Sequence, residues 1–235
     1  MNPIKTALMA ALLVAAGLGA PAQAALTVVS SVGNGAPANA TIRENFDGLT
    51  LGGGGGITPH NIDVRLISDG LAVQGASAGL YAPPFLSGNN GIGFGSPDQP
   101  NGANATTYLT TGSSGAFSGA QVELILPGLQ SFIGLLWGSV DLYNTLQLFN
   151  GSISVGTLTG AQVITNADGS QALGGTTYVS ITSTLVFNRA VFTSTSYAFE
   201  FDNVSLVAVP APASLALMGL ALAGLGAARR FRHQG

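Results

Sequence analysis

Hydrophobic and polar residues alternate along much of the chain between residues 25 and 208. From Gln121 to Leu126, the apolar side chains Val122, Leu124 and Leu126 share one face of an extended chain, with polar side chains between them. A period of two residues is typical of a half-buried β-strand. The same pattern predicts strands at Leu26–Val32, Thr41–Phe46, Ile62–Ser68, Thr106–Thr110, Gln121–Leu126, Ser131–Gly138, Tyr143–Leu148, Ser152–Leu158, Thr176–Thr182, Leu185–Thr193 and Tyr197–Ala208.

Turn residues separate these strands, and no stretch of the segment keeps helical periodicity over three turns. Asp69-Gly70 and Asn150-Gly151 each join two predicted strands directly. Such pairs favour tight hairpins, because both residue types tolerate positive φ. We therefore predict an all-β domain at residues 25–208, an antiparallel β-sandwich of jelly-roll type.

The last predicted strand contains a break in its alternation. Phe199 and Phe201 share one face, whereas Val204 and Leu206 have the opposite parity. The chain must slip by one residue between the two pairs, and a β-bulge at Asp202-Asn203 would achieve this.

Residues 1–24 have the pattern of a secretory signal peptide. Lys5 is followed by small and apolar residues from 7 to 19, and Pro21 ends this run. Ala22 and Ala24 place small residues at the two positions that signal peptidase reads, so we expect cleavage after Ala24. A buried helix or a membrane anchor is the alternative, but the run is shorter than the ~20 residues of a membrane span.

Residues 209–235 form a second apolar terminal segment. The apolar run 213–228 is followed by arginines, which predicts a short membrane helix with a cytoplasmic tail. A simple tail anchor is the alternative interpretation. The residues that flank the apolar run are Val209, Pro210, Ala211 and Pro212 before it, and Arg229, Arg230 and Arg232 after it.

A Pro-x-Pro box, a short apolar helix and an arginine cluster, in this order, resemble the PEP-CTERM sorting signal of Gram-negative bacteria. The resemblance implies processing at the box by exosortase, transient anchoring in the inner membrane, and delivery to the cell surface or an extracellular polysaccharide matrix. Ala211 stands where the usual box has Glu.

The charge balance restricts the ligands of the predicted domain. Charged residues make up only 7% of the chain, and there is no Cys, which excludes disulfides and thiolate chemistry. Between residues 25 and 209, three arginines face ten acidic residues and there is no Lys, giving a net charge near −7. Nucleic-acid binding needs several cations, so we expect no nucleic-acid partner. Neutral glycans and divalent cations remain compatible.

Two acidic segments suggest a metal-binding site. No other cofactor is expected. Glu-Asn-Phe-Asp at 44–47 and Phe-Asp-Asn-Val at 201–204 resemble segments of jelly-roll carbohydrate-binding modules. The resemblance implies that the two segments pair and share a structural calcium held by Glu44, Asp47 and Asp202. Calcium requires several oxygen ligands. In the alternative interpretation, Asp202 and Asn203 only satisfy backbone groups of the bulge.

The segment 137–144 suggests a sugar-binding surface. Trp137 is the only Trp, and Asp141, Tyr143 and Asn144 follow it closely. An aromatic ring with polar neighbours can stack on a sugar. Alternatively, Trp137 is a core residue and 141–144 is a connecting turn.

Two function classes follow from these patterns. The first is a non-catalytic surface or matrix protein that associates with extracellular polysaccharide. The second is a secreted hydrolase acting on a matrix polysaccharide or ester, with either His60 and Ser77 or the pair Glu123 and Glu200 as its candidate groups. Few groups of the domain titrate near neutral pH, and hydrolysis normally needs one, so we favour the non-enzymatic class.

Overall fold

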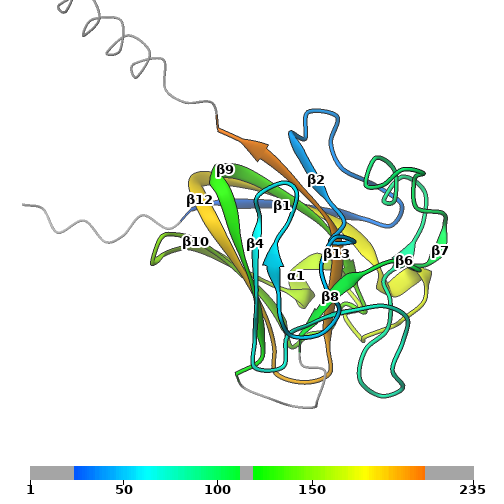
Figure 1. Cartoon of the computed structure of the whole chain (residues 1–235). Helices are drawn as coiled ribbons and strands as arrows, with labels where there is room; N and C mark the ends of the chain where they lie inside the picture. Colours follow the sequence, from blue (N-terminus) through cyan, green and yellow to red (C-terminus); the bar gives the residue numbers. More distant parts are fainter. Residues whose placement is uncertain (1–23, 112–118, 210–235) are drawn as a thin grey trace, which may run out of the picture.

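The computed structural model describes residues 24–111 and 119–209, which fold mainly into antiparallel β-sheet (Figure 1). Helix is confined, within these residues, to α1 (Gly160–Val163) and the 3₁₀ turn η1 (Leu173–Gly175). The strands are β1 (Leu26–Ser31), β2 (Ile42–Glu44), β3 (Gly56–Ile57), β4 (Asp63–Ile67), β5 (Leu71–Val73), β6 (Phe85–Leu86), β7 (Gly102–Ala103), β8 (Tyr108–Thr111), β9 (Gln121–Gly138), β10 (Asn144–Asn150), β11 (Ile153–Thr159), β12 (Thr177–Ser194) and β13 (Phe199–Ala208). The prediction of an antiparallel β-domain is confirmed, whereas its jelly-roll connectivity stays a prediction.

Two long strands, β9 and β12, run beside each other through the domain and organise the sheet (Figure 1). The first part of β9 pairs with β4 and with the second part of β12, which also pairs with β10. The second part of β9 pairs with β13 and with the first part of β12, which also pairs with β1. The register shifts where the two parts meet. Each long strand therefore connects two regions of one sheet.

The irregularity in β9 also changes which side chains face the core. Leu124 and Leu126 are buried before it, and Ile133 and Leu135 are buried after it, so the inward parity changes from even to odd. Gly128, between the two pairs, has φ +101°, a value that residues with a Cβ rarely adopt. This change of parity is why the sequence predicted two strands where the structure has one.

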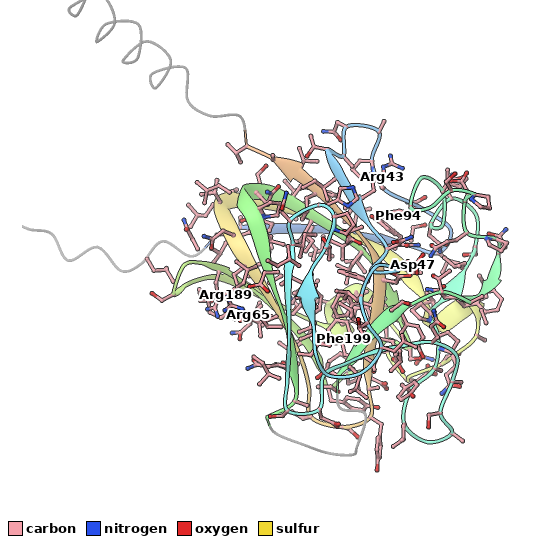
Figure 2. The ribbon with its side chains drawn as sticks, viewed as in Figure 1. Arg43, Asp47, Arg65, Phe94, Arg189 and Phe199 are labelled. Atoms are coloured by element: carbon pink, nitrogen blue, oxygen red, sulfur yellow. The ribbon has the colours of Figure 1, made fainter. Side chains whose placement is uncertain are left out.

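Aromatic rings fill the centre of the core. Trp137 stacks on Phe199 with ring centroids 4.1 Å apart, and Phe192 stacks on Phe201 at 3.8 Å. Phe46 meets Phe201 edge to face at 6.1 Å, which brings the segment after β2 against β13. Figure 2 shows Phe199 in the interior of the domain. These contacts fix the start of β13 against the end of β9.

The predicted bulge in the last strand is confirmed. Asp202 of β13 pairs with Leu136, and Ser205 pairs with Gly134, so β13 has one residue more than β9 over this interval. Asn203 at the bulge has φ +51°. The predicted pairing of the two acidic segments is also found, since Val204 pairs with Glu44.

The two predicted hairpins have different outcomes. Asn150-Gly151 connects β10 to β11, which pair with each other as expected. The prediction for Asp69-Gly70 is wrong, because β4 pairs with β3 and β9, whereas β5 pairs with β8. The turn at 69–70 is tight, with the Gly70 N–H donating to the Ile67 carbonyl at 3.1 Å, but it passes the chain from one pairing partner to another.

Residues 1–23 of the predicted signal peptide, with Ala22, and the predicted sorting helix lie outside the described residues. Ala24, at the predicted cleavage site, is described, and its N–H donates to the Val155 carbonyl at 3.2 Å. Among the residues that are described, no helix is long and apolar enough to span a membrane.

Candidate functional site

A pocket of about 200 Å³ opens where β9 ends and β13 begins. Four chain segments contribute to it: the loop between β5 and β6, the turn between β9 and β10, the segment between α1 and η1, and residues 197–200, where the loop before β13 enters that strand. The lining residues are Gly79, Leu80, Tyr81, Ser139, Asp141, Tyr143, Asp168, Gly169, Gln171, Tyr197, Ala198 and Glu200.

The turn between β9 and β10 is held in shape by a buried asparagine. Asn144 accepts a hydrogen bond from the Asp141 N–H at 2.9 Å and donates to the Ala198 carbonyl at 2.8 Å. It is fully buried and joins the turn to the loop before β13. Asp141 and Tyr143 are thereby fixed in the lining of the pocket, and the interpretation of 141–144 as a connecting turn is correct.

Asp141 is held from its other side by the segment that carries Asp168. The two residues form an isolated antiparallel bridge, and the Gly169 N–H donates to the Val140 carbonyl at 3.0 Å. A Cβ at position 169 would lie 2.6 Å from Asp141 Oδ1, and Gly169 has φ +72°. Only glycine fits here without displacing the Asp141 carboxyl group.

Glu200 is the most deeply buried acid of the pocket, with 2% of its surface exposed. Its Oε1 accepts a hydrogen bond from the Ala82 N–H at 2.9 Å, while its Oε2 has no hydrogen-bond partner. Burial raises the pKa of Glu200 from 4.5 to about 8. Burial also raises the pKa of Asp141, and the Tyr143 hydroxyl opposes this rise. Both carboxyl groups therefore lie in surroundings that favour protonation.

Three tyrosines supply the aromatic surface. Tyr81 packs edge to face on Tyr108, with ring centroids 6.4 Å apart. The Tyr143 hydroxyl donates to the Tyr197 carbonyl, and 43% of Tyr197 is exposed. Burial, followed by the neighbouring Asp141, raises the pKa of Tyr143 to about 12, so its hydroxyl stays protonated at neutral pH. Rings beside fixed polar groups form the kind of surface that binds small polar ligands.

The residues predicted for sugar binding have different positions. Asp141 and Tyr143 line the pocket. Trp137 is fully buried against Phe199, so the interpretation as a core residue is correct and the one as a surface stacking platform is wrong. Asn144 is buried and hydrogen-bonded within the turn, and it does not line the pocket. Sequence reasoning missed Tyr81, Tyr197 and Asp168, and it considered Glu200 only as the partner of Glu123.

The residues predicted to bind calcium are engaged mainly with protein donors. Glu44 accepts from the Phe46 N–H at 2.8 Å and contacts His60 Nδ1 at 2.9 Å. Asp47 accepts from the Asn45 amide at 2.7 Å and the Thr107 N–H at 3.0 Å. Within the part of the chain that the structure describes, no group of three or more His, Asp or Glu is arranged to hold a metal ion.

Asp202, the third predicted ligand, is fully buried. Asn104 donates to its Oδ2 at 2.6 Å, while its Oδ1 has no hydrogen-bond partner. Burial raises the pKa of Asp202 well above its ordinary value. The adjacent Asn203 donates to the Asn90 carbonyl at 2.9 Å, so both bulge residues tie β13 to loops. These contacts are structural, as in the alternative interpretation, but the two partners, the Asn104 amide and the Asn90 carbonyl, are not backbone groups of the bulge.

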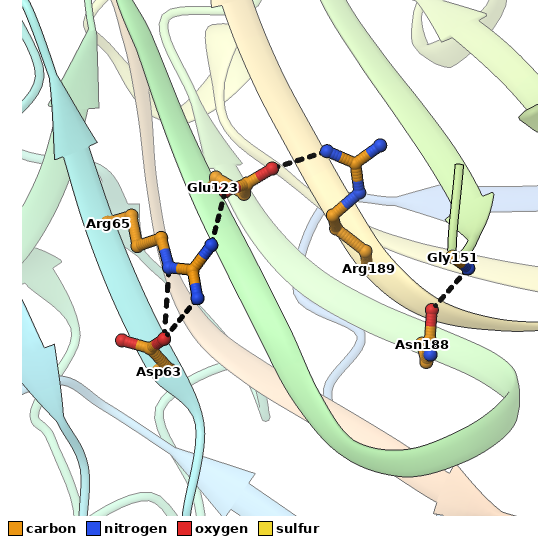
Figure 3. Close-up of polar contacts among 6 residues, drawn as sticks. All are labelled: Asp63, Arg65, Glu123, Gly151, Asn188 and Arg189. Carbon is orange, nitrogen blue, oxygen red and sulfur yellow. Dashed lines mark hydrogen bonds and ion pairs between the residues drawn. The ribbon is translucent and has the colours of Figure 1, made fainter.

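The residues considered for hydrolysis are not gathered at the pocket. Glu123 forms ion pairs with Arg65 at 3.4 Å and Arg189 at 2.5 Å (Figure 3). Arg65 also pairs with Asp63 at 2.9 Å, so the charges form a row across β4, β9 and β12. Figure 2 shows Arg65 and Arg189 close together on one side of the domain. Glu123, His60 and Ser77 are absent from the pocket lining, in contrast to Glu200.

Comparison with known proteins identifies one segment of the chain. Neither a curated protein nor a solved structure matches the chain significantly. A family model for the PEP-CTERM protein-sorting motif matches residues 208–230, which include the Pro210–Pro212 box and the pair Arg229-Arg230 but not Arg232. The match holds although Ala211 replaces the usual Glu. The chain therefore carries a PEP-CTERM protein-sorting motif, which marks it as an exported, exosortase-dependent protein that is transiently anchored in the membrane.

Proposed function

We propose that the β-domain binds extracellular polysaccharide at the tyrosine-lined pocket without cleaving it, at the cell surface or in the extracellular matrix of a Gram-negative bacterium. The pocket carries this proposal, because it combines Tyr81, Tyr143 and Tyr197 with carboxyl groups and the Gln171 amide. Sugars present apolar C–H faces and many hydroxyls, so aromatic rings beside hydrogen-bonding groups match both features. The sorting motif supports the setting, since it directs the protein out of the cell.

The dimensions of the pocket favour a short stretch of sugar. About 200 Å³ is less than the ~300 Å³ at the lower end of ordinary ligand pockets, which suits one sugar unit of a longer chain. A single such contact is weak. Many copies on one surface would bind one polymer at several points, and this raises the overall affinity by about 10²–10⁴.

Glycoside hydrolysis at the same pocket is the second candidate. One observation favours it: Glu200, with a pKa raised to about 8, lies near Asp141, whose charge contributes to that rise. A protonated and an ionised carboxyl group on either side of a glycosidic bond are the catalytic pair of many glycosidases. Ester hydrolysis has less support, because His60 contacts Glu44 and does not line the pocket.

The binding proposal is tested by titrating the purified protein with oligosaccharides released from the exopolysaccharide of its own source, using calorimetry. We expect measurable binding that Tyr197→Ala weakens by about tenfold, because an exposed ring contributes roughly 1–1.5 kcal/mol to a stacked contact. Leu142→Ala is the matched control, since Leu142 lies in the turn that carries Asp141 and Tyr143, is 65% exposed and does not line the pocket. Equal affinities for the wild type and Tyr197→Ala would reject the pocket as the binding site.

A further inference from the structure

We propose that, while the chain is anchored, the β-domain rests on the lipid bilayer by the end at which β13 finishes, with Leu129, Leu185 and Val209 among the lipid headgroups. We call this the C-terminal end of the domain. It is formed by the last residues of β13 and by the parts of β9 and β12, at residues 127–132 and 183–187, where these strands shift register. Such a contact is independent of what the pocket binds, so it goes beyond the proposed function.

Backbone pairing brings the three apolar side chains to one end of the sheet. The Val209 N–H donates to the Leu129 carbonyl at 3.2 Å. Phe187 of β12 pairs with Gln130, the residue after Leu129, and Leu185 lies in the register shift just before Phe187. Figure 1 shows β13 ending beside the bends of β9 and β12. The three side chains therefore come from adjacent strands at the same end of the domain.

The surface at this end is apolar and uncharged. Leu129, Leu185 and Val209 are 46%, 39% and 37% exposed. No charged residue occurs at 127–134, 180–187 or 204–209, the segments that meet here. The domain as a whole has three arginines against ten acids, so an anionic bilayer surface repels it over about 8–10 Å. The uncharged end is the one that can approach such a surface closely.

Both ends of the described chain also lie here. The Ala25 N–H donates to Thr184 Oγ1 at 3.1 Å, and the Thr184 N–H donates to the Ala25 carbonyl at 3.2 Å. Thr184 belongs to the same register shift of β12 as Leu185. The two predicted membrane segments of the precursor are therefore connected to one end of the domain.

The length of the connection to the sorting motif names the bilayer as the partner. The motif match begins at residue 208, which is the last residue of β13. Only residues 210–212 separate Val209 from the apolar run 213–228. Four steps between consecutive Cα atoms span at most roughly 14 Å, so the anchored domain cannot leave the bilayer surface by more than this. Exposed aliphatic side chains held so close to lipid can bury their apolar surface there.

A second copy of the chain is a poorer partner for this end. A stable protein–protein interface buries about 800 Å² on each side, which is more than three partly exposed aliphatic side chains supply. A bilayer needs no matching shape, and its headgroup region accepts apolar side chains that flank a membrane anchor.

The seating also orients the pocket. Glu200 lies near the start of β13, and Val209 follows its last residue. Nine residues of extended chain cover roughly 30 Å, so the pocket opens at the end of β13 that is remote from the bilayer. A domain seated in this way holds the pocket towards the space outside the membrane.

The test uses the full chain in vesicles of phosphatidylethanolamine and phosphatidylglycerol. The chain has no Cys, so one introduced Cys carries one nitroxide label. Labels are placed in Leu129→Cys and Leu185→Cys, and in the controls Leu142→Cys and Ile153→Cys, whose positions are 65% and 66% exposed. Electron paramagnetic resonance measures collisions with oxygen, which concentrates in lipid, and with a water-soluble nickel chelate.

We expect the ratio of oxygen to nickel collisions to be about threefold higher at positions 129 and 185 than at the two controls, because only the first two contact lipid. A second change separates apolar contact from the short connection alone. With the label at position 129, Leu185→Gln should reduce the ratio at least twofold, whereas Leu142→Gln should leave it unchanged.

Three results would overturn the proposal. Equal ratios at all four positions would mean that the connection holds the domain near the bilayer without contact. A high ratio at position 142 or 153 would mean that another surface meets the lipid. Fewer nickel collisions at position 129 without more oxygen collisions would mean that protein covers this end, as in a contact between two copies.

Discussion

The backbone N–H of Ala82 donates a hydrogen bond of 2.9 Å to the buried carboxyl group of Glu200, 118 residues further along the chain. This contact attaches the loop that carries Tyr81 to the first residues of β13. It also fixes the orientation of Glu200, with Oε1 occupied and Oε2 without a partner. The contact therefore holds Tyr81 and Glu200 in place in the lining of the same pocket.

The first prediction concerns the pH dependence of stability. The folded-state pKa of Glu200 is raised from 4.5 to about 8, and the pKa values of Asp141 and Asp202 are raised as well. Between pH 4.5 and 8, the folded state thus binds more protons than the unfolded state. Stability is therefore highest near pH 4.5 and falls as the pH rises towards 8. Each group contributes up to about 1.4 kcal/mol per pH unit. Urea unfolding at pH 5, 6, 7 and 8 measures the slope.

Glu200→Gln identifies the share of Glu200 in that slope. Gln does not ionise, and its side-chain oxygen can still accept from the Ala82 N–H. We expect the slope between pH 5 and 8 to become shallower by about 1 kcal/mol per pH unit. An unchanged slope would show that Glu200 ionises in the folded state as readily as in the unfolded state.

The second prediction concerns Trp137. Its ring is stacked on Phe199 and fully buried, so Trp137→Ala should reduce the free energy of unfolding by about 3–5 kcal/mol. Trp137→Phe should cost much less, because the indole N–H has no hydrogen-bond partner to lose. Leu142→Ala, on the surface, should stay within about 0.5 kcal/mol of the wild type. A stable Trp137→Ala variant that lost sugar binding would restore the surface role for this ring.

The third prediction concerns the bulge in β13. Asp202→Ala leaves the buried Asn104 amide without its acceptor, which should cost about 1–3 kcal/mol. Asp202→Asn keeps an acceptor oxygen and should cost less. We expect the loss in Asp202→Ala to be present in a chelator, because Asn104 bonds to Asp202 without a metal ion. If the wild type and Asp202→Ala unfolded at the same temperature in chelator, and calcium then stabilised only the wild type, Asp202 would be a calcium ligand.

The fourth prediction concerns processing. We expect the mature protein to begin near Ala25 and to end near the Pro210–Pro212 box, because the apolar segments on either side serve export and sorting. The intact mass of the protein recovered from the cell envelope and from the medium reports both ends at once. A surface-exposed form that still contains Arg229-Arg230 would contradict cleavage at the box.

Local patterns were sufficient to predict the antiparallel β class and most of the longer strands. The alternation of Val122, Leu124 and Leu126 predicted the start of β9, and the change of parity after Phe201 predicted the bulge that the structure has. The partners of a strand were harder to predict, because pairing depends on the whole sheet. Asp69-Gly70 has the sequence of a hairpin turn, yet its two strands pair with different neighbours.

The pocket could be predicted only in part. Asp141 and Tyr143 were found because they share one short turn. Tyr81 and Glu200 come from segments more than 100 residues apart, and no local spacing connects them. Trp137 was the obvious aromatic residue in the sequence, but its odd parity in the second part of β9 directs it into the core. Composition identified an acidic domain without Lys, and the fold brings three of its acids into one cavity.

The central claim, that the domain binds polysaccharide without cleaving it, is tested most directly by one incubation. The purified protein is mixed with exopolysaccharide from its own source, and the fraction of protein that sediments with the polymer is measured together with reducing ends over time. We predict co-sedimentation that Tyr197→Ala reduces and Leu142→Ala does not, with reducing ends constant throughout. Reducing ends that rise with time in the wild type but not in Glu200→Gln would contradict the claim and identify a glycosidase.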